Sequence, residues 1–98
     1  MSEDHASLER ALEVSNDMLA AAREGRWDSL PRMEVERAPL LRATHPRDDR
    51  SRELLEKLLA CNEEMLSLAA CARAQVADAL SRHGYAHRAL NSYVGLGR

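Results

Sequence analysis

Two histidines and two cysteines are the residues of this sequence whose types and spacing could carry chemistry. His83 and His87 are four positions apart, which would place two imidazoles on one face of a helix, where they could hold a metal ion. Gly84 lies between them, and no carboxylate or cysteine is close enough in the sequence to act as a third ligand. We therefore expect no metal site.

The cysteines, Cys61 and Cys71, lie ten positions apart on one expected helix, or about 15 Å, which is too far for a disulfide within that helix. We expect reduced thiols in the core of a cytosolic protein, and an intermolecular bridge stays open. A catalytic thiol needs an electropositive, partly exposed setting, and the apolar neighbours of Cys61 argue against one. His5 and His45 lie in polar segments. The sequence thus predicts no catalytic residue, no cofactor and no enzyme.

Composition indicates one small all-α domain over residues 1–98. Hydrophobic residues make up 45% of the chain but Phe is absent, and Ala, Leu, Glu and Arg dominate, which favours helices around an aliphatic core. A net charge of −2 gives no basic surface, so we expect no nucleic-acid partner. No apolar run approaches the roughly 20 residues of a membrane span, and the N-terminus is too polar for a signal peptide, so we expect a cytoplasmic protein without membrane contact.

Two short helices are expected first, at about 6–24 and 29–44. The first has a clean amphipathic pattern, and its apolar half contains Leu8, Ala11, Leu12, Val14, Ser15, Met18, Leu19, Ala21 and Ala22. Gly25 suits the left-handed position that ends a helix. The turn that follows is short, so the two helices should be antiparallel neighbours, with Trp27 covering the end of the core.

The second helix is less regular, because Glu34 and Arg37 share a face with its leucines. Pro39 should kink the helix or end it early. Arg37 has two interpretations. It could pair with Glu34 or Glu36, or it could be a polar anchor inside a partner-binding groove.

A long helix over residues 51–82, capped by Asp49 or Ser51, contains no Gly or Pro. It carries two adjacent apolar stripes. The first consists of Leu54, Leu58, Cys61, Met65, Leu68, Ala72 and Ala79, and the second of Leu55, Leu59, Leu66, Ala69, Val76 and Leu80.

The long helix would measure about 48 Å, against roughly 24 to 29 Å for the short ones, so they cannot cover all of it. Asn62 and Arg73 fall in the second stripe, which is therefore the expected open surface. Its cover would be the chain's own tail, a second copy or a partner. After Gly84 we expect a short C-terminal helix or tail, residues 84–98, in which Leu90 and Tyr93 could form a lid.

Several segments resemble the FliT family of flagellar type III export chaperones. The resemblance rests on the turn Ala22–Leu30, on Glu34, Glu36, Arg37 and Leu40–Leu41, on Leu54–Leu55, Leu58–Leu59, Asn62–Glu64 and Leu68–Ala69, and on Arg88–Tyr93. It implies a small helical chaperone of the cytoplasm. Such proteins bind the C-terminal segment of the filament-cap protein FliD and keep it unassembled until export. Family members can also contact the export ATPase complex and, in some bacteria, a flagellar transcriptional regulator.

The resemblance agrees with an antiparallel bundle of three helices whose second and third helices form an aliphatic groove for a client helix. In that groove, leucines would supply apolar burial, and Arg37 and Arg73 would pair with client carboxylates. The expected partner-binding residues are Met33, Arg37, Leu40, Leu41, Leu55, Leu59, Leu66 and Arg73. A homodimeric structural module, whose second stripe is its own interface, and a regulator that binds a flagellar transcription factor stay open as alternatives.

Overall fold

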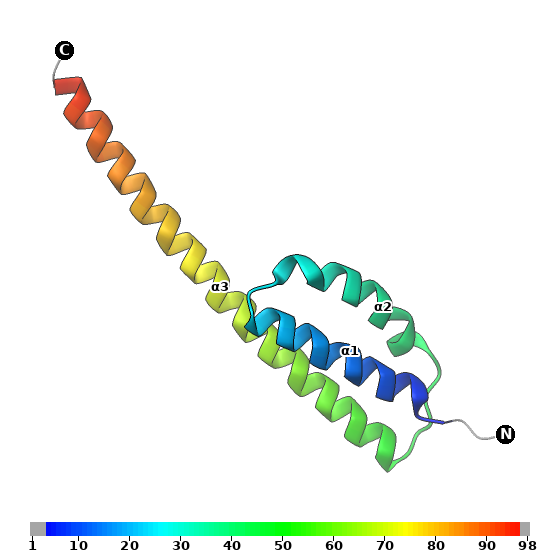
Figure 1. Ribbon diagram of the computed structural model, residues 1–98. Helices are drawn as coiled ribbons and strands as arrows, with labels where there is room; N and C mark the ends of the chain where they lie inside the picture. Colours follow the sequence, from blue (N-terminus) through cyan, green and yellow to red (C-terminus); the bar gives the residue numbers. More distant parts are fainter. Residues whose placement is uncertain (1–3, 97–98) are drawn as a thin grey trace. The chain divides into compact units, whose positions relative to one another are not determined.

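The computed structural model describes residues 4–96, with side chains as far as Tyr85 and at Arg88. This part of the chain contains three α-helices and no strand: α1 (Ala6–Arg23), α2 (Leu30–Arg42) and α3 (Asp49–Leu96) (Figure 1). A 3-10 turn, η1 (Trp27–Ser29), leads directly into α2. The all-α class and the order short, short, long are confirmed. None of the described helices is both long and apolar enough to span a membrane.

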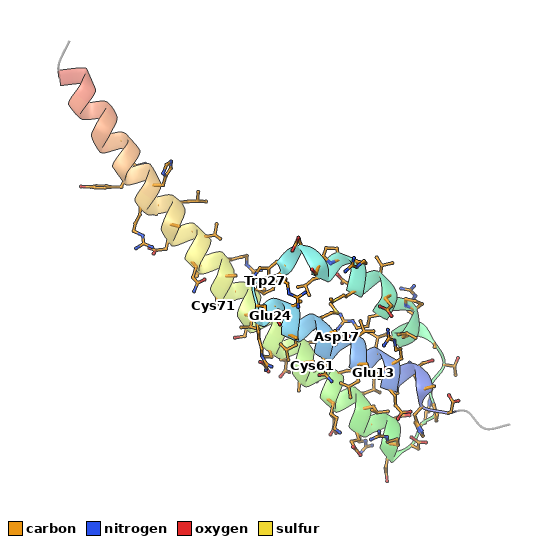
Figure 2. The ribbon with its side chains drawn as sticks, viewed as in Figure 1. Glu13, Asp17, Glu24, Trp27, Cys61 and Cys71 are labelled. Carbon is orange, nitrogen blue, oxygen red and sulfur yellow. The ribbon has the colours of Figure 1, made fainter. Side chains whose placement is uncertain are left out.

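The amphipathic pattern of α1 is reproduced residue by residue. Every member of its expected apolar face is buried apart from Leu12, which is half-buried. On the opposite face, Glu13 and Asp17 point to solvent (Figure 2). Because the 3.6-residue period decides which side chains face the neighbouring helices, the sequence alone was sufficient here.

A glycine ends α1 in the expected way. Gly25 has a φ of +76°, a left-handed conformation that a residue with a Cβ rarely adopts. The Arg26 amide donates to the Ala21 carbonyl at 2.8 Å, and the Gly25 amide donates to the Ala22 carbonyl at 3.1 Å. This pair of bonds is a Schellman motif, and it satisfies carbonyls that would otherwise lack partners at the helix end. The chain then turns back through half-buried Trp27 (Figure 2).

The chain divides into two compact units, residues 1–68 and 69–98. The core of the first unit consists of two clusters in which α1 packs against α3. One cluster contains Leu8, Ala11, Leu54 and Leu58, and the other contains Val14, Met18, Leu19 and Met65. Leu40 of α2 packs against both clusters, which closes a three-helix bundle. The core is aliphatic, as the absence of Phe indicated.

Helix α2 ends earlier than expected. It stops at Arg42 rather than Thr44, and Ala43 is extended with a ψ of 162°. Pro39 lies inside α2 and has no amide hydrogen to donate to the carbonyl four residues before it, which weakens the last turns of the helix. The linker to α3 therefore comprises residues 43–48.

The cap of α3 differs from the two residues expected. Asp48 accepts a hydrogen bond from the Ser51 amide at 2.8 Å, and α3 begins at the next residue, Asp49. A carboxylate just before the first helical residue satisfies one of the free amides of the first turn. Asp49 and Ser51 are themselves part of the helix.

Helix α3 does not stop at Arg82, and the expected break at Gly84 is absent. The backbone stays helical through Gly84 as far as Leu96. A glycine inside a helix costs roughly 1 kcal/mol relative to alanine, which is too little to end a helix whose neighbouring residues favour it. The segment expected as a separate helix or tail, residues 84–98, is thus part of α3 up to Leu96.

In the second unit, no described side chain from Ala69 to Tyr85 is buried. Val76, Leu80 and Tyr85 are the large apolar residues there, and they are 58%, 64% and 71% exposed. Cys71, which we expected in the core, is also exposed. The first apolar stripe is therefore buried only where α1 and α2 cover it, and Ala79 at its far end is exposed.

Candidate partner-binding surface

A hollow of about 240 Å³ opens between α2 and α3 in the first unit. Its apolar wall comes from Leu41 on α2 and from three leucines of α3. Its polar wall comes from one cation and one amide. The lining residues are Arg37, Leu41, Leu55, Leu58, Leu59 and Asn62.

The leucines around this hollow are exposed to an unusual degree for large apolar residues. Leu41, Leu55 and Leu59 are 37%, 46% and 59% exposed, whereas Leu58, between them in the lining, is only 6% exposed. Leu66 lies two turns further along the same stripe of α3 and is 63% exposed. Exposed leucines on two neighbouring helices form an apolar surface of the kind that marks a binding site, because its contact with water is unfavourable.

A second hollow, of about 550 Å³, adjoins the linker at the other side of the same leucines. It shares Leu55 and Leu59 with the first hollow, and its remaining lining comes from the linker and the first turns of α3. Those residues are His45, Pro46, Arg47, Asp48, Asp49, Ser51, Arg52 and Glu56. Leu55 and Leu59 therefore belong to both hollows, which makes them the centre of this surface.

Arg37 contributes the positive charge of the α2–α3 hollow. Its Nη1 donates a hydrogen bond of 3.1 Å to Oγ of Ser15, a side chain of α1 that is fully buried. The arginine itself is half-buried. Its expected carboxylate partners lie elsewhere: Glu36 pairs with Arg10 at 2.5 Å, and no described carboxylate forms an ion pair with Arg37.

A third hollow, of about 510 Å³ between α1 and α3, has a different character. Its charged residues already pair with one another, Arg10 with Glu13 at 3.3 Å and Arg50 with Glu9 at 3.5 Å. Leu12 and Leu54 in its lining are half-buried and buried. Neither of these leucines is an exposed large apolar residue, whereas Leu41, Leu55 and Leu59 are, so the α2–α3 surface is the better candidate for a partner.

Of the residues expected to bind a partner, the structure brings Arg37, Leu41, Leu55 and Leu59 around one hollow. Met33 and Leu40 are half-buried and pack against the core instead. Arg73 is exposed and belongs to the second unit. The side chains of the expected lid, Leu90 and Tyr93, lie outside the described residues.

Two features of this surface were not among the expected site residues. Asn62 lines the hollow, and its place in the second stripe was the available signal for it. The linker residues beside Leu55 could not be assigned to the surface from the sequence, because periodicity says nothing about a loop.

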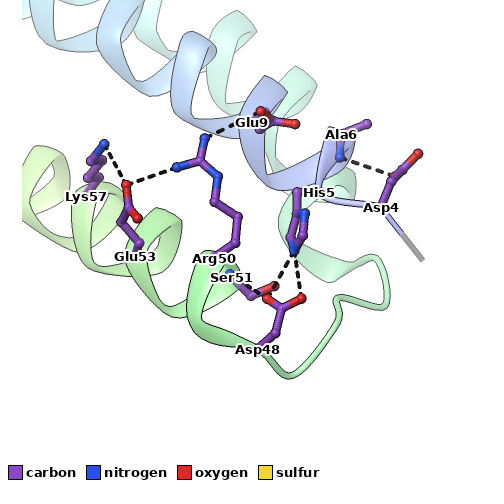
Figure 3. A network of polar contacts seen from close by, with 9 residues as sticks. All are labelled: Asp4, His5, Ala6, Glu9, Asp48, Arg50, Ser51, Glu53 and Lys57. Atoms are coloured by element: carbon purple, nitrogen blue, oxygen red, sulfur yellow. Dashed lines mark hydrogen bonds and ion pairs between the residues drawn. The ribbon is translucent and has the colours of Figure 1, made fainter. Parts of the chain in front are cut away.

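The titratable side chains that the structure describes form no catalytic arrangement. His5, Asp48 and Ser51 lie together, but His5 and the Ser51 amide both contact the carboxylate, and the buried Ser51 hydroxyl has no hydrogen-bond partner among the described residues (Figure 3). A nucleophile needs the histidine as its base, so this cluster works as a helix cap. Within the described residues, no group of three or more His, Cys, Asp or Glu side chains could hold a metal ion.

Comparison with protein families identifies the family to which this helical bundle belongs. The model of the family described as "Flagellar protein FliT" matches residues 5–95, nearly the whole chain. The chain belongs to the FliT family. Comparison with the curated proteins and with the solved structures gives no significant match.

The FliT family is a family of flagellar export chaperones. In a FliT chain, a surface of exposed leucines with one half-buried cation is suited to bind an amphipathic helix. The family match extends over both units of the chain, from the start of α1 almost to the end of α3.

Proposed function

We propose that this chain is a cytoplasmic chaperone that binds the C-terminal helical segment of the filament-cap protein FliD on the α2–α3 surface. Bound there, the segment would be unable to take part in filament-cap assembly until type III export. The observation that carries the proposal is the exposure of Leu41, Leu55 and Leu59 around one hollow in a chain of the FliT family.

The driving force for such binding is burial of leucine side chains. Each Å² of apolar surface removed from water contributes about 25 cal/mol, before the cost of ordering the client is subtracted. A client helix with apolar residues at spacings of three and four can cover Leu55 and Leu59 together, since these two residues are themselves four apart on α3. Leu66 would extend the same contact along the helix.

Binding tests with purified FliD examine this assignment directly. We expect Leu59→Asp and Leu66→Asp to abolish binding of FliD while far-UV circular dichroism keeps its helical signal, because both side chains are exposed. Val35→Asp is the matched control: Val35 is an apolar residue of α2 that is 75% exposed but does not line either hollow beside Leu55. A pull-down in which both leucine variants retain FliD would refute the assignment of this surface.

A homodimer is the second candidate, and the exposed Val76 and Leu80 of the second unit are the observation in its favour. A dimer could also hide a client surface until the client arrives. Light scattering across a dilution series separates the two functions. A tight dimer that persists unchanged when FliD is added would favour a structural module, and a complex with FliD would favour the chaperone. Contacts with the export ATPase complex or a transcriptional regulator would then be tested against the same leucine variants.

A further inference from the structure

Among the described residues, the only hydrogen-bond partner of Arg37 is a neutral hydroxyl, the buried Oγ of Ser15 at 3.1 Å. A guanidinium carries five N–H donors, so most of the donors of Arg37 have no protein acceptor. Its side chain is nevertheless half-buried between α1 and α2. A cation in such a position loses part of its hydration without gaining an anion, which is unfavourable unless a partner supplies one.

The other arginines of the first unit either pair with a carboxylate or are exposed to water, as Arg32, Arg42, Arg47 and Arg52 are, whereas Arg37 is half-buried and has no carboxylate partner among the described residues. Arg10 pairs with Glu36, Arg23 with Glu64, and Arg50 with Glu53. All six residues in these pairs are exposed to solvent. Arg37 is the arginine that lines the α2–α3 hollow, and its neighbours in that lining are four leucines and Asn62. The charge therefore faces an apolar site that has no negative group of its own among the described residues.

We propose that Arg37 selects the client by its charge: the client helix carries an aspartate or glutamate that pairs with the Arg37 guanidinium. This inference rests on the proposed function and specifies the partner chemistry at the same surface. Apolar residues three or four positions from that acid cover Leu55 and Leu59, because such positions lie on the same face of a helix. Nη1 can stay on Ser15 while the remaining donors engage the carboxylate. An arginine–carboxylate pair at the edge of an apolar surface also fixes the direction and register of the client.

The experiment uses the full chain and a synthetic peptide of the C-terminal segment of FliD, with binding measured by isothermal titration calorimetry. Arg37→Met removes the charge and keeps a long apolar side chain. We expect it to weaken binding by about tenfold to a hundredfold, as the loss of a charged hydrogen-bonded pair does. Arg32→Met is the matched control, since Arg32 is an exposed arginine of the same helix that does not line the hollow. Arg32→Met should leave the affinity unchanged.

Variants of the peptide provide an independent arm. Each aspartate and glutamate of the peptide is replaced in turn by its amide. One replacement should weaken binding to the native chain as much as Arg37→Met does, and that replacement should have no further effect on the Arg37→Met chain, because the interaction is then already absent. Raising the salt concentration should weaken the native complex more than the Arg37→Met complex.

The outcomes separate this inference from the proposed function. If the peptide binds Arg37→Met as tightly as the native chain while Leu59→Asp abolishes binding, the charge selection is wrong and the chaperone function stands. If neither the peptide nor whole FliD binds the native chain, the proposed function fails. Should Arg37→Met fail to fold, the amide series decides on its own, and equal affinity of every amide variant for the native chain overturns the inference.

Discussion

His5 and Asp48 join the beginnings of two helices, with His5 Nε2 lying 2.9 Å from Oδ2 and 3.0 Å from Oδ1 of Asp48 (Figure 3). The same carboxylate accepts the Ser51 amide at 2.8 Å, so Asp48 both caps α3 and holds the start of α1. Close by, Arg50 pairs with Glu9 of α1 at 3.5 Å. The end of the bundle beside the linker is thus held by polar contacts, while its interior is held by leucine and methionine.

Replacing Asp48 by alanine should lower the melting temperature by a few degrees near neutral pH, because the cap and the contact with His5 are both lost. The amide of Ser51, and then the imidazole of His5, hold the pKa of Asp48 below its ordinary value of 3.8. A carboxylate with a lowered pKa in the folded state stabilises the fold above its unfolded-state pKa. That contribution disappears as the pH falls through the folded-state pKa.

Thermal unfolding followed by circular dichroism over a pH series measures this effect. The difference in melting temperature between the native chain and Asp48→Ala should be largest near neutral pH and should shrink below pH 3.8. Asp49→Ala is the control, because the neighbouring carboxylate is exposed and forms no hydrogen bond or ion pair with the described residues. A gap between native and Asp48→Ala that is independent of pH would contradict the role of the ionised carboxylate.

Leu54 and Leu55 are adjacent in the sequence and should respond in opposite ways to truncation. Leu54 is 1% exposed in the core, so Leu54→Ala should cost about 2–5 kcal/mol of unfolding free energy. Leu55 is 46% exposed, and Leu55→Ala should change stability by less than about 1 kcal/mol. Urea titration measures both values. Binding of FliD should weaken for Leu55→Ala, and equal stability losses for the two variants would show that the helix is rotated from this arrangement.

The two thiols should differ in reactivity. Cys71 is exposed, whereas Cys61 is half-buried (both are labelled in Figure 2). The Cys61 thiol donates to Oδ1 of Asn16 on α1 at 3.3 Å. We expect an alkylating reagent to label Cys71 several times faster than Cys61 in the folded chain, and at the same rate after denaturation. Peptide mapping by mass spectrometry assigns the rates. Equal rates in the folded chain would mean that the contact between α1 and α3 at Cys61 opens readily.

Periodicity predicted which face of each helix is apolar but not which neighbour covers it. In α1 the apolar face was enough to predict burial, because the whole of that face packs against the core. In α2, Leu40 and Leu41 were assigned to the same surface, yet Leu40 packs on the core and Leu41 lines the open hollow. Adjacent residues differ by about 100° around a helix. The position of α3 decides which of the two leucines faces the core and which faces the open hollow.

Capping and termination were the features that local sequence specified least. Gly25 was assigned correctly, since a left-handed turn position strongly favours glycine. The cap of α3 was not, because Asp48, Asp49 and Ser51 can all cap a helix and the contact with His5 from a distant segment adds to the preference for Asp48. The partner of Arg37 was likewise missed, because Ser15 is 22 positions away on another helix.

The two glycines at Gly25 and Gly84 give a final, matched prediction. Gly84 is helical, and among the described side chains a Cβ at this position would meet only Arg88 Nη1 at 3.5 Å, an ordinary contact. Gly84→Ala should therefore stabilise α3 locally, by about 1 kcal/mol of helix propensity, and slow amide hydrogen exchange in the turns around it. Gly25→Ala should instead destabilise the first unit, because alanine is strained at a φ of +76° even though nothing lies within 4 Å of its Cβ. Hydrogen exchange with mass spectrometry on the full chain follows both variants. Faster exchange around position 84 in Gly84→Ala would mean that this glycine interrupts the helix, as its position in the sequence first indicated.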